Sequence, residues 1–201
     1  MIAVIDYDAG NIKSVEKALT AIGQDVIVTR NSSEIVRADR VILPGVGAFG
    51  DAMGRLNQYG LVDTIHEVID KGRPFLGICL GLQLLFDSSE ESEGVKGLSV
   101  LSGKVVRFPD NMGLKIPQIG WNSLEINPDS RLFKGIDNQA YAYFVHSYYL
   151  KADEPKVVAA TCEYGVNVHA AVEKDNVFAC QFHPEKSSSI GLRILKNFAT
   201  I

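Results

Sequence analysis

The segment that most constrains the fold is Gly77-Ile78-Cys79-Leu80-Gly81, in which glycines flank a cysteine. The apolar run Pro74 to Leu76 precedes it, and Leu82 to Phe86, a run with helical character, follows it. This pattern predicts a strand, a sharp turn that carries the cysteine, and a helix. We expect glycines there because the backbone bends tightly and passes close to its neighbours, where a side chain would block it.

The cysteine of this turn has the surroundings of a nucleophile. Cys79 is expected at a helix N-terminus, where the helix dipole favours the thiolate. Far downstream, the segment Gln181 to Glu185 contains a histidine and a carboxylate, His183 and Glu185. A cysteine with a distant histidine and carboxylate is typical of a nucleophile, base and orienter set. On an extended backbone, stiffened by Pro184, both side chains would point the same way.

Composition narrows the class of protein. The chain has 201 residues, enough for one sizeable α/β domain over residues 1–201, and we find no linker or repeat. A net charge of −4 without a basic cluster argues against nucleic acid as a partner. The longest apolar runs are too short to cross a membrane. Three cysteines without a CxxC pair predict no disulfide framework and no zinc site, and they favour the reducing cytoplasm.

The order of apolar segments predicts the fold class. The N-terminal half alternates short β-like runs with helical periodicity, in the order β-α-β-β-α-β-α, which is typical of an α/β, doubly wound, mainly parallel sheet with helices on both faces. From Leu98 to Phe182 short β-like runs dominate, and we expect antiparallel or mixed strands that continue the sheet and add an edge layer. A helix over Ile190 to Phe198 closes the chain. The predicted C-terminal strands are Val100–Leu101, Val105–Val106, Leu124–Ile126, Tyr141–Val145, Val157–Thr161, Ala170–Val172 and Phe178–Phe182.

Three segments are expected to meet at one edge of this sheet. In doubly wound sheets, ligands bind outside the carboxyl ends of the strands. The turn at Cys79 lies there, as does the loop Pro44 to Gly47 after the third predicted strand. A parallel strand that ends at Phe182 would bring His183 to the same edge.

The chemistry expected at this edge is cleavage of an amide. The Cys79 thiolate attacks the carbonyl carbon, and His183 accepts the thiol proton and then protonates the departing nitrogen. Glu185 fixes the imidazole tautomer and stabilises the imidazolium. The oxyanion needs backbone N–H donors, for which Leu80 and the loop Gly45 to Gly47 are the natural sources.

Together these residues resemble a known family. Gly77 to Gly81 with Phe182 to Glu185 is similar to the class I, triad, glutamine amidotransferases. Further segments resemble, within that family, the glutaminase subunits of imidazole glycerol phosphate synthase, and Leu82 and Val46 favour this branch over the chorismate-directed and carbamoyl-phosphate enzymes. These segments are Asp8 to Asn11, Pro44 to Gly50, Gly94 to Leu98, Gly120 to Asn122, Tyr143 to Tyr148 and Glu185 to Ser187.

The resemblance implies an activity and a partner. It implies hydrolysis of glutamine to glutamate and ammonia, without a cofactor or metal, and channelling of the ammonia to a (β/α)₈-barrel cyclase subunit in a heterodimer of histidine biosynthesis. Family members are nearly silent until the partner is occupied. The implied cause is an oxyanion loop, here Gly45 to Gly47, in which the Val46 peptide must flip to present a donor beside that of Leu80.

The resemblance also implies residue roles. Gln83 lies one helical turn past Cys79 and would face the substrate, and Glu91 would read the ammonium group of glutamine. The backbone of Ser147 and Tyr148 would hold the substrate carboxylate. The implied substrate-binding residues are Gly47, Gln83, Glu91, Ser147 and Tyr148; the implied interface residues are Trp121, Tyr143 and Lys186.

Other interpretations stay open on sequence alone. The chain could be another cysteine hydrolase, such as a peptidase- or deglycase-like protein, or a degenerate subunit that only binds a partner. His146 is either a structural hydrogen-bonding residue or a catalytic one. Cys162 and Cys180 are expected in the core, where free cysteine packs as a small hydrophobic residue. Asp6 and Asp8 are interpreted as turn residues.

Overall fold

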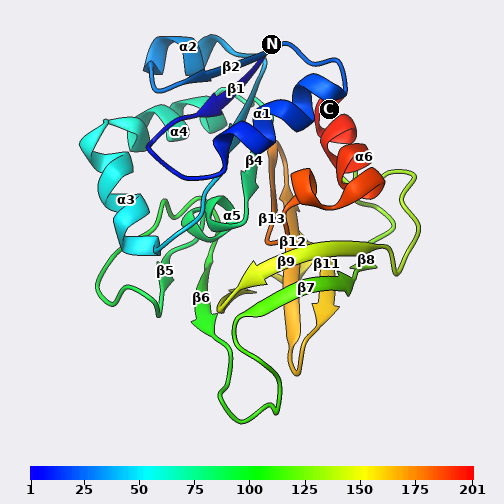
Figure 1. Ribbon diagram of the computed structural model, residues 1–201. Coiled ribbons are helices and arrows are strands. Elements are labelled where there is room, and N and C mark those ends of the chain that lie inside the picture. The colour runs from blue at the N-terminus through cyan, green and yellow to red at the C-terminus, as the bar shows by residue number, and fades with distance from the viewer.

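A mixed eight-stranded sheet forms the centre of the computed structural model, which describes residues 1–201 (Figure 1). The strand order is β2-β1-β3-β4-β13-β12-β11-β8. The strands from β2 to β13 are parallel, whereas β12, β11 and β8 add antiparallel pairs on one side. Their bounds are β1 Ile2–Ile5, β2 Val26–Thr29, β3 Arg40–Leu43, β4 Phe75–Ile78, β8 Glu125–Ile126, β11 Val158–Glu163, β12 Asn167–Lys174 and β13 Val177–Cys180.

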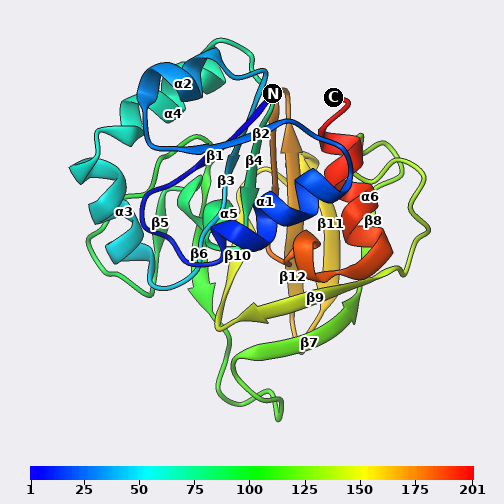
Figure 2. The same cartoon turned by 45° about the horizontal axis from the view of Figure 1, so that its top comes forward.

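Helices cover both faces of this sheet, because side chains alternate along each strand. In β1, Ile2 and Val4 enter one hydrophobic cluster, and Ala3 and Ile5 enter the other. Figures 1 and 2 show α1 and α6 on one side and α2 to α5 on the other. The doubly wound, mainly parallel fold predicted from the sequence is confirmed. The helices are α1 Ile12–Ala21, α2 Ser32–Arg37, α3 Phe49–Gln58, α4 Leu61–Asp70, α5 Leu80–Leu84 and α6 Ser188–Phe198.

The remaining strands form two small sheets. One has the order β10-β6-β5, and the other pairs β7 with β9 in antiparallel fashion. Of the predicted C-terminal strands, β8, β11, β12 and β13 continue the central sheet, whereas β6 and β9 lie in the two small sheets, and the strand predicted at Val100–Leu101 does not form. The bounds are β5 Ser88–Ser89, β6 Gly103–Arg107, β7 Gln118–Ser123, β9 Tyr141–His146 and β10 Tyr148–Ala152, with short 3₁₀ turns η1 Pro155–Val157 and η2 Pro184–Lys186.

Two helices, α2 and α3, were not expected from the sequence. The α2 helix has six residues and begins at Asn31, whose side chain accepts hydrogen bonds from the N–H groups of Ser33 and Glu34. In α3, buried residues recur at helical spacing from Phe49 to Leu56, but Gly50 and Gly54 interrupt the pattern. None of the helices is long and apolar enough to cross a lipid bilayer.

The glycines around Cys79 are required by close backbone contacts. A Cβ on Gly81 would lie 1.9 Å from the carbonyl oxygen of Leu43, at the end of β3. A Cβ on Gly77 would lie 2.6 Å from the carbonyl oxygen of Gly81. The expectation that a side chain would be blocked there is confirmed. The absence of these side chains lets α5 pack directly against β3 and β4.

A methyl group at Gly81 is expected to destabilise the fold. Gly81→Ala forces backbone apart and should lower the free energy of unfolding by about 3 kcal/mol. In the matched control Gly54→Ala, at an exposed position of α3, no atom lies within 4 Å of the added Cβ, and stability should rise by up to about 1 kcal/mol. Urea unfolding measures both changes. Equal effects of the two substitutions would contradict the packing described here.

Candidate active site

The backbone at Cys79 has the conformation expected of a nucleophile-bearing turn. Cys79 follows β4 and immediately precedes α5, with a φ of 55° and a ψ of −108°. A positive φ at a non-glycine residue is strained, at a cost of roughly 1–3 kcal/mol, and such strain clusters at active sites. The side chain is nearly buried, and it lines a pocket. The strand, turn and helix predicted around this cysteine are therefore present.

Parallel pairing of two strands brings His183 to the same edge. β13 pairs with β4 in a register that places Cys180 opposite Ile78, so both chains leave the sheet together. Nδ1 of His183 lies 2.7 Å from Oε1 of Glu185. The prediction of an extended backbone around Pro184 is wrong. Pro184–Lys186 form a 3₁₀ turn, and this turn places the Glu185 carboxylate beside the imidazole.

The electrostatics of this group favour a protonated imidazole. Burial by itself lowers the pKa of His183, but the neighbouring Cys79 sulfur and Glu185 carboxylate outweigh it and raise the pKa to about 9. The side chains of His183 and Glu185 are 1% and 0% exposed, so water screens this pair weakly. Nε2 of His183 has no hydrogen-bond partner, which leaves it free for a reacting group.

Asn11 also belongs to this group of side chains around Glu185. The sequence pattern predicts only a turn and a helix start at Asn11. Its Nδ2 donates to Oε1 of Glu185 at 2.5 Å, the same oxygen that faces His183. Asn11 has a φ of 73°, a left-handed conformation that asparagine tolerates well. Its place after β1, at the same sheet edge, is the signal that could have suggested it.

A pocket of about 320 Å³ collects the expected substrate residues around Cys79 and His183. A larger hollow of about 690 Å³ lies beside α6 and contains no cysteine or histidine. The pocket is lined by all five residues that the resemblance assigns to the substrate, and by Val46 and Leu80. These five residues are Gly47, Gln83, Glu91, Ser147 and Tyr148.

The two expected oxyanion donors are close together, but one of them is occupied. The N–H of Leu80 donates to the carbonyl oxygen of Gly45 at 3.3 Å. The N–H of Val46 donates to no group within the chain. The carbonyl of Gly45 and the N–H of Val46 belong to one peptide unit, so its present orientation places an acceptor where an oxyanion would need a donor.

Two further side chains shape the pocket. Oε2 of Glu91 accepts a hydrogen bond of 2.8 Å from the N–H of Phe49, at the start of α3. Burial lowers the pKa of His146 to about 4, and its Nδ1 lies 2.8 Å from the Tyr148 carbonyl oxygen. Since a carbonyl only accepts, the neutral ring donates from Nδ1. His146 therefore makes a hydrogen bond of the kind expected if it is a structural residue, which is one of the two interpretations left open by the sequence.

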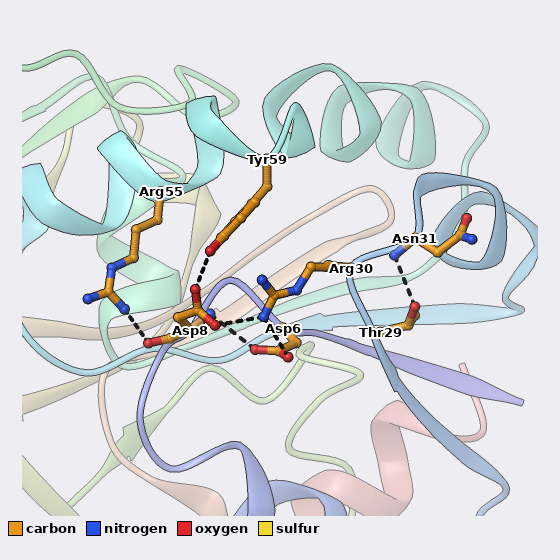
Figure 3. Close-up of polar contacts among 7 residues, drawn as sticks. All are labelled: Asp6, Asp8, Thr29, Arg30, Asn31, Arg55 and Tyr59. Carbon is orange, nitrogen blue, oxygen red and sulfur yellow. Dashed lines mark hydrogen bonds and ion pairs between the residues drawn. The ribbon is translucent and has the colours of Figure 1, made fainter.

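A polar cluster fixes the loop that precedes Asn11 (Figure 3). Arg30 lies between two carboxylates, 2.6 Å from Oδ1 of Asp8 and 3.0 Å from Oδ2 of Asp6. Tyr59 donates to Asp8 as well, and this hydrogen bond, followed by that from Arg30, lowers the pKa of Asp8. Arg55 donates to the Asp8 carbonyl oxygen. The two aspartates, interpreted as turn residues, thus also pair with a cation.

The expected interface residues gather on one exposed face near the pocket. Trp121 on β7 lies opposite Tyr143 on β9, with ring centroids 6.0 Å apart. Exposed Ile119 and Tyr141 lie on the same face, and Trp121 itself is 52% exposed. Lys186, in η2, is exposed too. This face is connected to the proposed catalytic residues, since the N–H of His183 donates to the Tyr143 carbonyl oxygen.

The other cysteines lie away from solvent. Cys162 is 1% exposed and Cys180 is 0% exposed, which confirms the core positions expected for them. Burial raises the pKa of both thiols, that of Cys162 to about 12. All three cysteines are free, and no group of histidine, cysteine and acidic side chains in the chain could hold a metal ion. Cys79 is therefore the cysteine with access to a pocket.

Comparison with known proteins identifies relatives along the whole chain. The family model for glutamine amidotransferase class-I matches residues 3–201. The chain is 52% identical over 200 residues to "Imidazole glycerol phosphate synthase subunit HisH" of Chlorobaculum tepidum, covering 99% of each chain. It is 50% identical over 201 residues to the protein of that name in Methanocaldococcus jannaschii, covering 100% of each.

Solved structures share the fold at low identity. A crystal structure of a glutamine amidotransferase superimposes with a TM-score of 0.78 at 20% identity and full coverage of both chains. The structure of PurLQS from Thermotoga maritima gives a TM-score of 0.73 at 19% identity, covering 99% of this chain and 97% of that one. These structures support the architecture alone.

Titration of the histidines tests the electrostatics of the site formed by Cys79, His183 and Glu185. By NMR of ring-labelled protein, His183 should titrate near pH 9 and His146 should stay neutral down to about pH 4. Since the folded-state pKa of His183 is raised, its pairing stabilises the fold fully below its ordinary pKa of about 6.5, and this contribution is lost as the pH rises through about 9.

The variant Glu185→Gln removes the carboxylate and should lower the titration midpoint of His183. An unchanged His183 midpoint in Glu185→Gln, or a midpoint at or below 6.5 in the unaltered chain, would show that the pair does not stabilise the imidazolium.

Proposed function

The chain belongs to the class I glutamine amidotransferase family, and we propose that it is the glutaminase subunit of an imidazole glycerol phosphate synthase, which supplies ammonia for histidine biosynthesis. We further propose that residues 1–201 form one amidotransferase domain. Identity of about 50% to the HisH subunits, over essentially whole chains, supports the assignment. The observation that carries the reaction is one pocket in which Cys79 and His183 meet five residues expected to bind glutamine.

The proposed reaction proceeds through a thioester on Cys79. The thiolate forms a C–S bond to the carboxamide carbon of glutamine, and the carbonyl π electrons move to oxygen. The tetrahedral intermediate collapses with cleavage of the C–N bond, and protonated His183 gives its proton to the nitrogen, which leaves as ammonia. Neutral His183 then takes a proton from water as the water oxygen attacks the thioester, the C–S bond breaks, and glutamate and thiolate result. Glu185 holds the imidazole orientation throughout.

Glutamine recognition is proposed to combine one carboxylate with backbone donors. Oε2 of Glu91 is held by the Phe49 N–H, which leaves Oε1 for the substrate ammonium group. The backbone at Ser147 and Tyr148 lines the opposite part of the pocket and would hold the substrate carboxylate. Gly47 and Gln83 complete the proposed contacts. This arrangement would select an α-amino acid with a side-chain amide that reaches Cys79.

The oxyanion hole is proposed to form by rotation of one peptide. In the structure the Gly45 carbonyl faces the Leu80 N–H, and the Val46 N–H is unpaired. A flip of the peptide that joins Gly45 and Val46 would remove the acceptor and add a donor in one step. Gly47, with a φ of 101°, gives the loop a conformation that other residues rarely adopt. Loss of one oxyanion donor typically lowers kcat about 10²- to 10³-fold, which would keep the resting subunit slow.

A partner protein is proposed for the exposed aromatic face. Ammonia released into water is diluted and protonated, so a synthase gains from direct delivery to a second active site. Trp121, Tyr143 and Lys186 lie on or beside this face, which the His183 N–H joins through the Tyr143 carbonyl. We propose a 1:1 heterodimer with a (β/α)₈-barrel cyclase subunit, in the cytoplasm, where the three free cysteines stay reduced.

Glutamate release by the purified chain, alone and with the cognate cyclase plus a nucleotide acceptor analogue, tests the proposal. Strong stimulation in the complex is expected, with loss of at least about 10³-fold in Cys79→Ala. The buried Cys162→Ala serves as the matched control and should keep its turnover if it folds. Turnover that survives Cys79→Ala would exclude the nucleophile. Silence of a folded complex, with hydrolysis of a peptide or glycated substrate instead, would favour another cysteine hydrolase.

The proposed interface predicts a binding defect. Trp121→Ala truncates an exposed aromatic side chain at the centre of the proposed interface. It should weaken association with the cyclase by about 2 kcal/mol, or about 30-fold in Kd. Isothermal titration calorimetry measures this. The control His66→Ala removes a ring on α4, on the other side of the molecule, and should leave Kd unchanged. Equal affinities of Trp121→Ala and the unaltered chain would place the partner elsewhere.

A further inference from the structure

Two buried glutamines connect the sulfur of Cys79 to the pocket wall. Gln181 is 0% exposed and Gln83 is 5% exposed. Nε2 of Gln83 donates to Oε1 of Gln181 at 3.0 Å and to the carbonyl oxygen of Tyr148 at 3.2 Å. Nε2 of Gln181 lies 3.7 Å from Sγ of Cys79 as a hydrogen-bond donor. Gln181 follows β13 and has no role in the reaction derived above.

The direction of each hydrogen bond in this chain follows from one acceptor that cannot change. The Tyr148 carbonyl can only accept, so Gln83 must present its Nε2 to it. The same Nε2 faces Gln181, whose Oε1 must therefore be the atom on that side. The remaining end of the Gln181 amide, Nε2, then points at the sulfur. The Gln181 backbone is held as well, since its N–H donates to the Ala170 carbonyl at 2.8 Å.

We propose that Gln181 is a catalytic residue that donates an N–H from Nε2 to the Cys79 sulfur and so stabilises the thiolate. The proposal rests on the proposed function for the identity of the nucleophile. A thiolate accepts a hydrogen bond more strongly than a thiol, so a fixed donor favours the charged form. The neutral amide transfers no proton, and it serves both the attacking thiolate and the thiolate that leaves the thioester.

Few other groups can stabilise charge on this sulfur. The N–H of Leu80 is occupied by the Gly45 carbonyl, and α5 is only five residues long. The titratable groups that face Cys79 are His183, Tyr7 and Cys180. The Tyr7 hydroxyl donates to the Pro44 carbonyl at 2.9 Å, and Cys180 is buried as a thiol. His183 and Gln181 are therefore the donors left for the thiolate.

Alkylation of Cys79 tests the proposal without using glutaminase activity. The rate of iodoacetamide modification is followed against pH by mass spectrometry of the Cys79 peptide, in the complete chain. Gln181→Met keeps the volume and removes the donor, so the midpoint of the profile should rise by about one pH unit, equivalent to about 1.4 kcal/mol. In the complex, kcat for glutamine should fall about tenfold with little change in KM. Gln58→Met, at an exposed position on α3, is the control and should change neither.

A second variant keeps the test decisive if Gln181→Met does not fold. Gln83→Met removes the donor that orients the Gln181 amide, so the amide can turn and the midpoint should rise by a smaller amount. A midpoint in either folded variant equal to that of the unaltered chain overturns the proposal. A raised midpoint supports the proposal. If the midpoint is raised but the unaltered complex hydrolyses no glutamine, the proposed function fails and the role of Gln181 as a donor to the thiolate stands.

Discussion

The candidate site depends on the parallel pairing of β4 with β13. This one contact joins residues about one hundred positions apart and aligns Cys180 with Ile78. The chain therefore leaves both strands at the same edge, one into Cys79 and the other toward Gln181 and His183. Without this pairing the thiol, the imidazole and the amide donor would have no common pocket. The tight contacts at Gly77 and Gly81 come instead from the packing of α5 against β3 and β4.

Burial makes the charges of this edge effective. The side chain of Glu185 is 0% exposed and accepts from both His183 and Asn11, so its charge is screened little by water. The same low-dielectric surroundings would penalise a thiolate that lacked donors. The proposed reaction thus combines an imidazolium, an amide N–H and a peptide that can rotate. The exposed face is joined to the same site, because the N–H of His183 donates to the carbonyl oxygen of Tyr143.

Much of the site could be predicted from the sequence because its signals are local. Glycines around Cys79 and the pair His183 and Glu185 mark a turn and an acid–base couple, and the fold class follows from the order of apolar runs. Other features depend on tertiary contacts that no local pattern carries. The 3₁₀ turn at Pro184 replaces the expected extended backbone, α3 is obscured by two helical glycines, and β6 and β9 lie outside the central sheet. The contacts of Asn11 and Gln181 depend on side-chain directions fixed only by the packed fold.

Trapping of the covalent intermediate tests the central claim most directly. The complex is mixed with glutamine, quenched in acid within milliseconds to seconds, and examined by intact-protein and peptide mass spectrometry. The account predicts a γ-glutamyl adduct on Cys79 and none on buried Cys162 or Cys180, with loss of the adduct in Cys79→Ser. Glutamate release without any adduct on Cys79, or an adduct on another cysteine, would contradict it.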